Sequence, residues 1–198
     1  MKKFLALLIV GLIFSFGQSS VSAQGKILVA YFSRIGEEYG VGNITKGNTA
    51  IVAEIIAKKT GADLFEIKTV KSYPNNYDEC TKVASREKAQ NARPELATRV
   101  NNFDSYDTIF IGSPVWYSTS PMAIYTFLES YNFSGKKIIP FVTHAGSGLG
   151  DIPQRFSLIC PDAEFLKGLA VRGSVAQNNS AEVESKVEEW LEKIKIDL

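Results

Sequence analysis

The chain has 198 residues, of which 45% are hydrophobic and 22% are charged, a composition typical of a globular protein with about one domain. Its formal net charge is +1, from 22 basic and 21 acidic side chains, so the sequence does not predict a nucleic-acid-binding surface. The two cysteines, Cys80 and Cys160, lie outside any C-x-x-C motif, which argues against a metal site or a thioredoxin-type site. The sequence does not decide whether the two cysteines form a disulfide, and two separate buried thiols are the favoured interpretation.

The first 23 residues differ from the rest of the chain. Two lysines precede an apolar run from Phe4 to Phe16, and small residues then lead to Ala23. This order is typical of a secretory signal peptide, and the run is short for a membrane span. We therefore expect residues 1–23 to be a cleaved signal peptide and residues 24–198 to be the mature domain, exported to the periplasm or the extracellular space without stable membrane insertion. An uncleaved membrane anchor is the alternative.

The mature chain alternates apolar β-type runs with helical patterns, which is the signature of a parallel sheet covered by helices. Strands are predicted at residues 27–32, 63–69, 108–112, 137–143 and 164–171. Helices are predicted at residues 48–59, 77–91, 121–131 and 181–194. Gly61 is expected to end the first helix. The sequence thus predicts one α/β domain with three layers and a five-stranded sheet.

Ligands of open α/β sheets bind beyond the carboxyl ends of the strands, so the segments that leave those ends are candidates for the site. The first runs from Ser33 to Thr49. A hydroxyl side chain at the strand end, Gly47 and the Asn48-Thr49 pair at a helix start together predict hydroxyl and backbone N–H donors for a phosphate group. Helix capping without any ligand is the alternative, because Asn and Thr are common at helix starts.

The second segment, "GSPVWYSTSP", places Trp116 and Tyr117 directly after a buried strand. Two large aromatic side chains in such a loop indicate a platform for a flat aromatic ligand. The alternative for one of the two is packing against the end of the sheet as part of the core.

The third segment, "THAGSGLGD", contains three glycines that allow the backbone to approach a ligand closely. His144, the single histidine of the chain, has no carboxylate or nucleophile beside it in sequence. We therefore expect a local hydrogen-bonding role for His144 and no acid or base catalysis.

Taken together, these segments resemble the flavodoxin family, and within it the secreted bacterial flavodoxins. The resemblance is carried by "YFSR" before "GNT", by the long segment "GSPVWYSTSPMAIYTFLESYNFSGKKIIPF" and by "GSGLG", and it spans essentially the whole mature chain. It implies a flavodoxin-like three-layer sandwich with a parallel sheet in the order 2-1-3-4-5, and FMN as the cofactor.

The resemblance also implies which residues bind FMN. The phosphate would be held by Ser33, Arg34, Asn48 and Thr49. The isoalloxazine ring would be lined by Pro114, Val115, Trp116 and Tyr117, with Ala145, Gly146 and Ser147 near its other edge. No residue is assigned a catalytic role, because a flavin itself performs the redox chemistry.

The chain departs from the family pattern in its phosphate loop. The usual compact S-x-x-G-N-T turn is interrupted here by the insertion "IGEEYGVGNITK", residues 35–46, whose glycines indicate a turn-rich or mobile excursion. Whether Thr45 contributes to the site is left open. Tyr39 is expected to be a solvated loop residue, with a position over the ligand as the alternative.

Three functions agree with these features, because a fold by itself does not determine activity. The first is an FMN-binding electron carrier outside the cytoplasm, whose partner is a redox protein or a small-molecule acceptor. The second is an FMN-dependent reductase of quinones or other small molecules that uses NAD(P)H. The third is a binding module that has lost the flavin.

Overall fold

The computed structural model describes residues 25–196, so the predicted signal peptide lies outside the described residues. The main sheet consists of β1 (Lys26–Tyr31), β4 (Asp63–Glu66), β5 (Tyr106–Pro114), β6 (Lys137–His144), β7 (Glu164–Phe165) and β8 (Leu169–Arg172). Its order is β4-β1-β5-β6-β7, with β8 also paired to β6, and all of these pairs are parallel. This arrangement confirms the predicted α/β sandwich and its 2-1-3-4-5 order.

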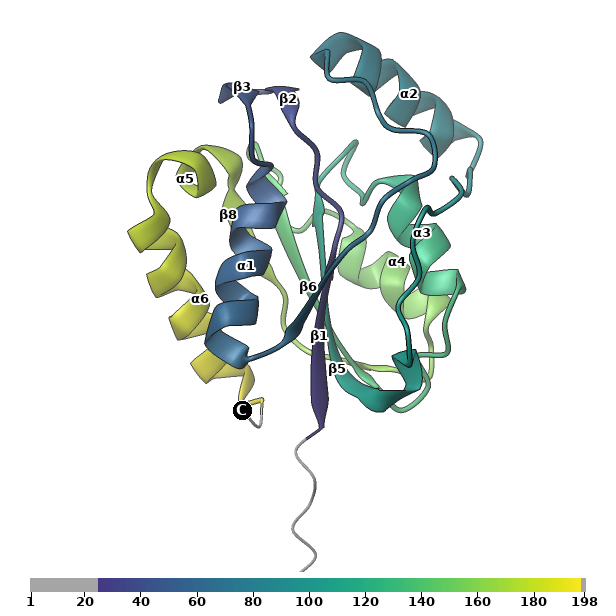
Figure 1. Ribbon diagram of the computed structural model, residues 1–198, viewed down its shortest axis with the longest axis vertical. Helices are drawn as coiled ribbons and strands as arrows, with labels where there is room; N and C mark the ends of the chain where they lie inside the picture. Colours follow the sequence, from purple (N-terminus) through teal and green to yellow (C-terminus); the bar gives the residue numbers. More distant parts are fainter. Residues whose placement is uncertain (1–24, 197–198) are drawn as a thin grey trace, which may run out of the picture.

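Helices cover both faces of this sheet, as Figure 1 shows. Successive strand residues point to opposite faces, so neighbours such as Val29 and Ala30 in β1 belong to different cores. Both are fully buried, which explains why the central strands are apolar at nearly every position. The helices are α1 (Asn48–Thr60), α2 (Tyr77–Ala89), α3 (Met122–Glu129), α4 (Ile152–Ile159), α5 (Gly173–Asn178) and α6 (Ser180–Ile194), with a short 3₁₀ helix at Phe103–Ser105.

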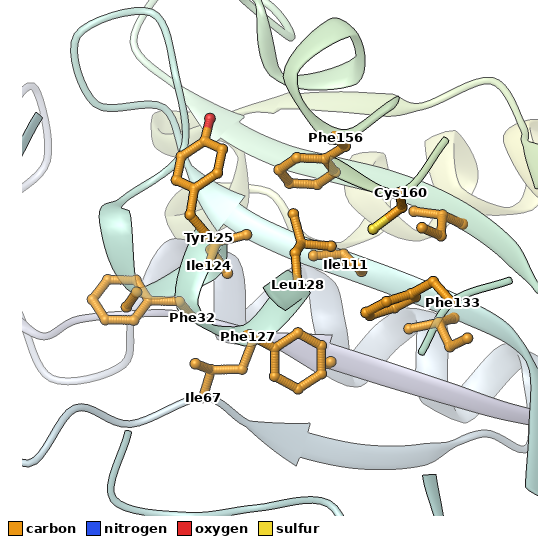
Figure 2. Close-up of a cluster of buried hydrophobic side chains, with 14 of the residues drawn as sticks. Phe32, Ile67, Ile111, Ile124, Tyr125, Phe127, Leu128, Phe133, Phe156 and Cys160 are labelled. Carbon is orange, nitrogen blue, oxygen red and sulfur yellow. The ribbon is translucent and has the colours of Figure 1, made fainter. Parts of the chain in front are cut away.

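The two cores differ in the helices that complete them. On one face, α1 and α6 pack against the sheet through side chains such as Val52 and Val187. On the other face, α3 and α4 contribute Phe127 and Phe156, which Figure 2 shows within a cluster of buried side chains. Both phenylalanines are fully buried, and a side chain of this kind stabilises the fold by about 1.5–3 kcal/mol.

Most predicted elements are confirmed with shifts of one or two residues at their ends. Gly61 ends α1 as expected, because it adopts the left-handed conformation at φ 66° and its N–H bonds back to the Ala57 carbonyl. The strand predicted at residues 63–69 is shorter and stops at Glu66. Helices α4 and α5 were not predicted, since each has only six to eight residues and shows too little periodicity.

The prediction of one continuous strand at residues 164–171 is wrong. Ile138 pairs with Phe165 and Phe141 pairs with Leu169, so three residues of the last segment lie opposite two residues of β6. The extra residue interrupts the ladder and divides the segment into β7 and β8.

The insertion at residues 35–46 forms an antiparallel hairpin of β2 (Gly36–Glu38) and β3 (Gly42–Ile44). This inserted hairpin lies beyond the start of α1, at the same end of the molecule as α2 (Figure 1). Both cysteines are free and buried, as favoured from the sequence. Among the described residues, no helix has both the length and the apolar character needed to cross a membrane.

Candidate functional site

A pocket of about 470 Å³ lies where the loops after β1, β5, β6 and β8 meet, at the carboxyl ends of the strands. The volume is within the usual range for small-molecule sites. It is lined by Arg34, Glu38, Tyr39, Gly40, Asn48, Tyr77, Cys80, Thr81, Ala84, Pro114, Val115, Trp116, Tyr117, Thr143, His144, Ala145, Arg172, Gly173 and Ser174. All three segments selected from the sequence contribute to it.

One end of the pocket is formed by the start of α1. Ser33 Oγ accepts a hydrogen bond from the Ala50 N–H at 3.2 Å, so a residue at the end of β1 caps this helix from a distance. Gly47 lies directly against it, because a Cβ at residue 47 would be 2.1 Å from Ser33 Oγ. The first turn of α1 contains no acidic side chain, which leaves its positive end free for an anion.

Asn48 and Thr49 have different environments in this turn. Asn48 lines the pocket, and its Oδ1 accepts a hydrogen bond from Gln177 Nε2 at 2.8 Å. Thr49 is only 1% exposed, and its hydroxyl shares a 2.8 Å hydrogen bond with the hydroxyl of Thr143 in β6. Ser33 and Thr49 therefore shape the pocket from behind its wall, and their predicted contact with phosphate stays a prediction.

Arg34 lines the pocket, but its guanidinium contacts the inserted hairpin and the segment before α2. Its Nη2 donates to the Glu37 carbonyl at 2.9 Å and to the Asn75 carbonyl at 2.8 Å, and Nη1 lies 3.1 Å from the Glu38 carboxylate. Burial raises the pKa of Glu38, and the Arg34 charge partly offsets that rise. The predicted role of Arg34 as a phosphate ligand is not tested by this geometry.

The aromatic loop after β5 forms a second wall. Trp116 is partly buried and makes edge-on contacts with the rings of Phe32 and Tyr73, at centroid distances of 5.6 and 5.1 Å. Tyr117 is 48% exposed and adopts φ 51°, a conformation that is uncommon for a bulky residue. Its carbonyl accepts a hydrogen bond from Lys88 Nζ at 2.6 Å. Pro114 and Val115 complete this wall.

The loop after β6 contributes His144 and Ala145 to the pocket, whereas Gly146 and Ser147 are not among the described residues that line it. His144 Nδ1 accepts a hydrogen bond from the Gly148 N–H at 3.1 Å, which agrees with the predicted local role. Burial lowers the pKa of His144, and the charges of Arg172 and Lys186 lower it further. The imidazole is therefore neutral at pH 7.

Sequence reasoning missed two groups of lining residues. Arg172, Gly173 and Ser174 follow the end of the last strand, so the rule that selected the other three loops could have found them. The second group comes from α2, and no local pattern marked it. The hairpin residues that line the pocket lie within the first segment selected from the sequence, and Tyr39 is both exposed and part of the pocket lining. Within residues 25–196, no cluster of His, Cys, Asp or Glu side chains has the arrangement of a metal site.

The family model described as Flavodoxin matches residues 26–194. The chain belongs to the flavodoxin family. Its fold resembles candidate flavoproteins from Bacteroides eggerthii and Bacteroides uniformis, each with 29% identity and a TM-score of 0.67. The alignments cover 87% and 84% of this chain and 99% of each neighbour.

A third neighbour is a flavoprotein from Lactobacillus acidophilus NCFM that was solved in complex with FMN. It has 24% identity and a TM-score of 0.62, and the alignment covers 84% of this chain and 98% of that protein. None of the curated proteins compared with the chain matches it.

Proposed function

We propose that this flavodoxin binds FMN in the 470 Å³ pocket and transfers electrons between a reductase and an acceptor. The observation that carries the proposal is that one pocket combines a helix start without acidic side chains and an aromatic wall. FMN has a phosphate at one end and a flat ring at the other, so the helix start suits the phosphate and the aromatic wall suits the ring.

The phosphate end fits because Gly47 allows the chain after β1 to pack directly against the start of α1. A Cβ at this position would lie 2.4 Å from the Arg34 carbonyl oxygen as well as 2.1 Å from Ser33 Oγ. The first turn of α1 carries no acidic side chain, and the helix dipole favours negative charge there. The pocket-lining amide of Asn48 adds a polar group at the same place.

The ring end fits because Tyr117, which is about half exposed, lines the pocket beside the partly buried Trp116. When bound, FMN would supply one- and two-electron redox chemistry, while the protein binds the cofactor and sets its electrostatic surroundings. The FMN complex of the Lactobacillus neighbour and the family match both support FMN as the cofactor.

The proposal includes an extracytoplasmic location, which rests on the sequence of residues 1–23 alone. Its partners would be a redox protein or a small-molecule acceptor in that compartment. Intact-mass measurement of the exported protein tests the location, with a mature chain that begins at Gln24 as the expected result. Retention of residues 1–23 in a membrane fraction would instead indicate an anchored protein.

Titration of the purified apoprotein with FMN and with riboflavin tests the binding proposal. We expect flavin absorbance to shift and flavin fluorescence to be quenched on binding, with FMN binding more tightly because riboflavin lacks the phosphate. Absence of FMN binding at micromolar concentration would refute the proposal and favour a module that has lost the flavin.

Single alanine variants of Trp116 and Tyr117 test the ring end. We expect Tyr117→Ala to weaken FMN binding and to raise the potential of the semiquinone/hydroquinone couple, because an aromatic face disfavours the electron-rich reduced ring. Trp116→Ala should mainly lower the melting temperature, since its ring packs against Phe32 and Tyr73. Photoreduction followed by absorbance separates the two effects, and wild-type behaviour of both variants would contradict the aromatic-wall interpretation.

A further inference from the structure

The inserted hairpin is fastened to the segment that leads into α2. The Glu37 N–H donates to the Asn75 carbonyl at 2.8 Å. In return, the Glu37 carboxylate accepts hydrogen bonds from Asn76 Nδ2 at 2.7 Å and from the Tyr77 N–H at 3.0 Å. The hairpin and the start of α2 are therefore joined by backbone and side-chain contacts between residues about forty positions apart.

Arg34 lies at the base of this junction and contacts both sides of it. Its guanidinium bonds to the carbonyl of Glu37 in the hairpin and to the carbonyl of Asn75 before α2, and it pairs with the Glu38 carboxylate. The side chains of this pair are only 7% and 16% exposed, so solvent screens the interaction weakly. Loss of either partner would leave a buried charge without compensation.

The position of the hairpin determines one side of the pocket. Glu38, Tyr39 and Gly40 all line it, and all three come from the hairpin or its turn. Tyr39 is 68% exposed, and its ring centroid lies 6.3 Å from that of Tyr77, which lines the pocket from α2. If the hairpin moved away, this part of the wall would be lost.

We propose that Arg34 is a positioning residue that holds the inserted hairpin closed over the pocket, and that Tyr39 thereby becomes a cofactor-binding residue. The second half of this proposal rests on the proposed binding of FMN. The first half concerns the protein alone.

The geometry of Arg34 favours this role over direct phosphate binding. A guanidinium recognises phosphate best through two parallel N–H bonds. Both terminal nitrogens of Arg34 already face the hairpin and the Asn75 carbonyl. Three of its five N–H groups are used in these contacts, and within residues 25–196 its buried Nε has no hydrogen-bond partner.

Arg34→Gln, Glu38→Gln and the double variant, titrated with FMN and with riboflavin, distinguish the two roles. Because the hairpin would line the site of either flavin, with or without a phosphate, we expect each single variant to lose about tenfold or more in affinity for both flavins. The double variant should lose little more than either single one, since the two residues act through one contact. Lys193→Gln, which removes an exposed ion pair with Glu189 on α6, serves as the matched control and should bind like wild type.

The opposite pattern would overturn the proposal. If Arg34→Gln weakens FMN but leaves riboflavin unchanged, and Glu38→Gln affects neither, then Arg34 is a phosphate ligand and does not act through the hairpin.

Hydrogen exchange of the apoprotein, followed by mass spectrometry, tests the fastening without any flavin. We expect amides of residues 36–44 to exchange at least several-fold faster in Arg34→Gln and Glu38→Gln than in wild type, with exchange in α1 and the central strands unchanged. If the amides of the hairpin exchange at the same rate in wild type and in both variants, Arg34 and Glu38 do not hold the hairpin in place. This result is independent of FMN binding, so failure of the proposed function and failure of this inference are distinguishable.

Tyr39→Ala tests the binding half of the proposal. Because Tyr39 is exposed, the melting temperature of this variant should stay at the wild-type value. We expect faster release of both flavins from Tyr39→Ala, and release at the wild-type rate from Tyr39→Phe, which keeps the ring. Wild-type release from the alanine variant would show that Tyr39 does not contact the cofactor.

Discussion

The hydrogen bond between Thr49 and Thr143 joins the start of α1 to the end of β6, behind the candidate phosphate end of the pocket. The two hydroxyl groups lie 2.8 Å apart, and the residues are 1% and 3% exposed. Replacing either threonine by valine keeps the side-chain shape but leaves the other hydroxyl buried without this partner. A buried unsatisfied polar group costs about 1–3 kcal/mol, so each single variant should be destabilised by that amount.

The double variant should behave differently. With both hydroxyls replaced by methyl groups of the same shape, no polar group is left unpaired, and the free energy of unfolding should return to within about 1 kcal/mol of wild type. Thr49→Ser, which keeps the hydroxyl, serves as the control. For a chain of this size each 1 kcal/mol shifts the melting temperature by roughly 2–4 °C, so the single variants should melt roughly 2–12 °C lower.

Urea and thermal denaturation of the apoproteins, followed by circular dichroism, measure these differences. If the destabilisation of the double variant equals the sum of the two single ones, the hydroxyls do not depend on one another and the reasoning fails. Titration of the same variants with FMN and riboflavin tests the sequence-based role of Thr49. A direct contact with phosphate is worth about 1.5–3 kcal/mol, so Thr49→Val would then bind FMN about tenfold more weakly or worse and riboflavin normally.

Two further predictions concern the strands around the pocket. Gly112→Ala should lower the free energy of unfolding by about 1–3 kcal/mol, because the new Cβ would lie 2.1 Å from the buried Phe141 ring. Urea denaturation measures this loss, and adding Phe141→Leu should restore part of it. The imidazole of His144 should titrate below 6.5 in an NMR experiment, since burial lowers its pKa. As the pH falls, the imidazole is protonated in the unfolded chain before it is protonated in the folded one. The stability that His144 contributes is therefore complete above pH 6.5 and is lost as the pH falls below it. His144→Gln should remove this pH dependence. A pKa of 6.5 or higher would contradict this assignment.

The sequence by itself determined the elements whose signals are local. The apolar run "ILVAYF" predicts a strand buried on both faces, because only such a strand is apolar at nearly every position. Gly61 predicts the end of α1, because only a residue that tolerates positive φ stops a helix in this way. The loops that follow the strands were found by the same kind of reasoning, and all three reach the pocket.

Other features depend on contacts between distant parts of the chain, and only the tertiary structure decided them. The break between β7 and β8 follows from one extra residue opposite β6, and pairing register is not visible in the composition of a strand. The sequence does not show that Arg34 bonds to the carbonyl of Asn75, which lies 41 positions away. The hydroxyl of Thr49 likewise faces Thr143, which is 94 positions away. A side chain's type and its neighbours in sequence fix which hydrogen bonds it can make, whereas the folded chain fixes which of those bonds it does make.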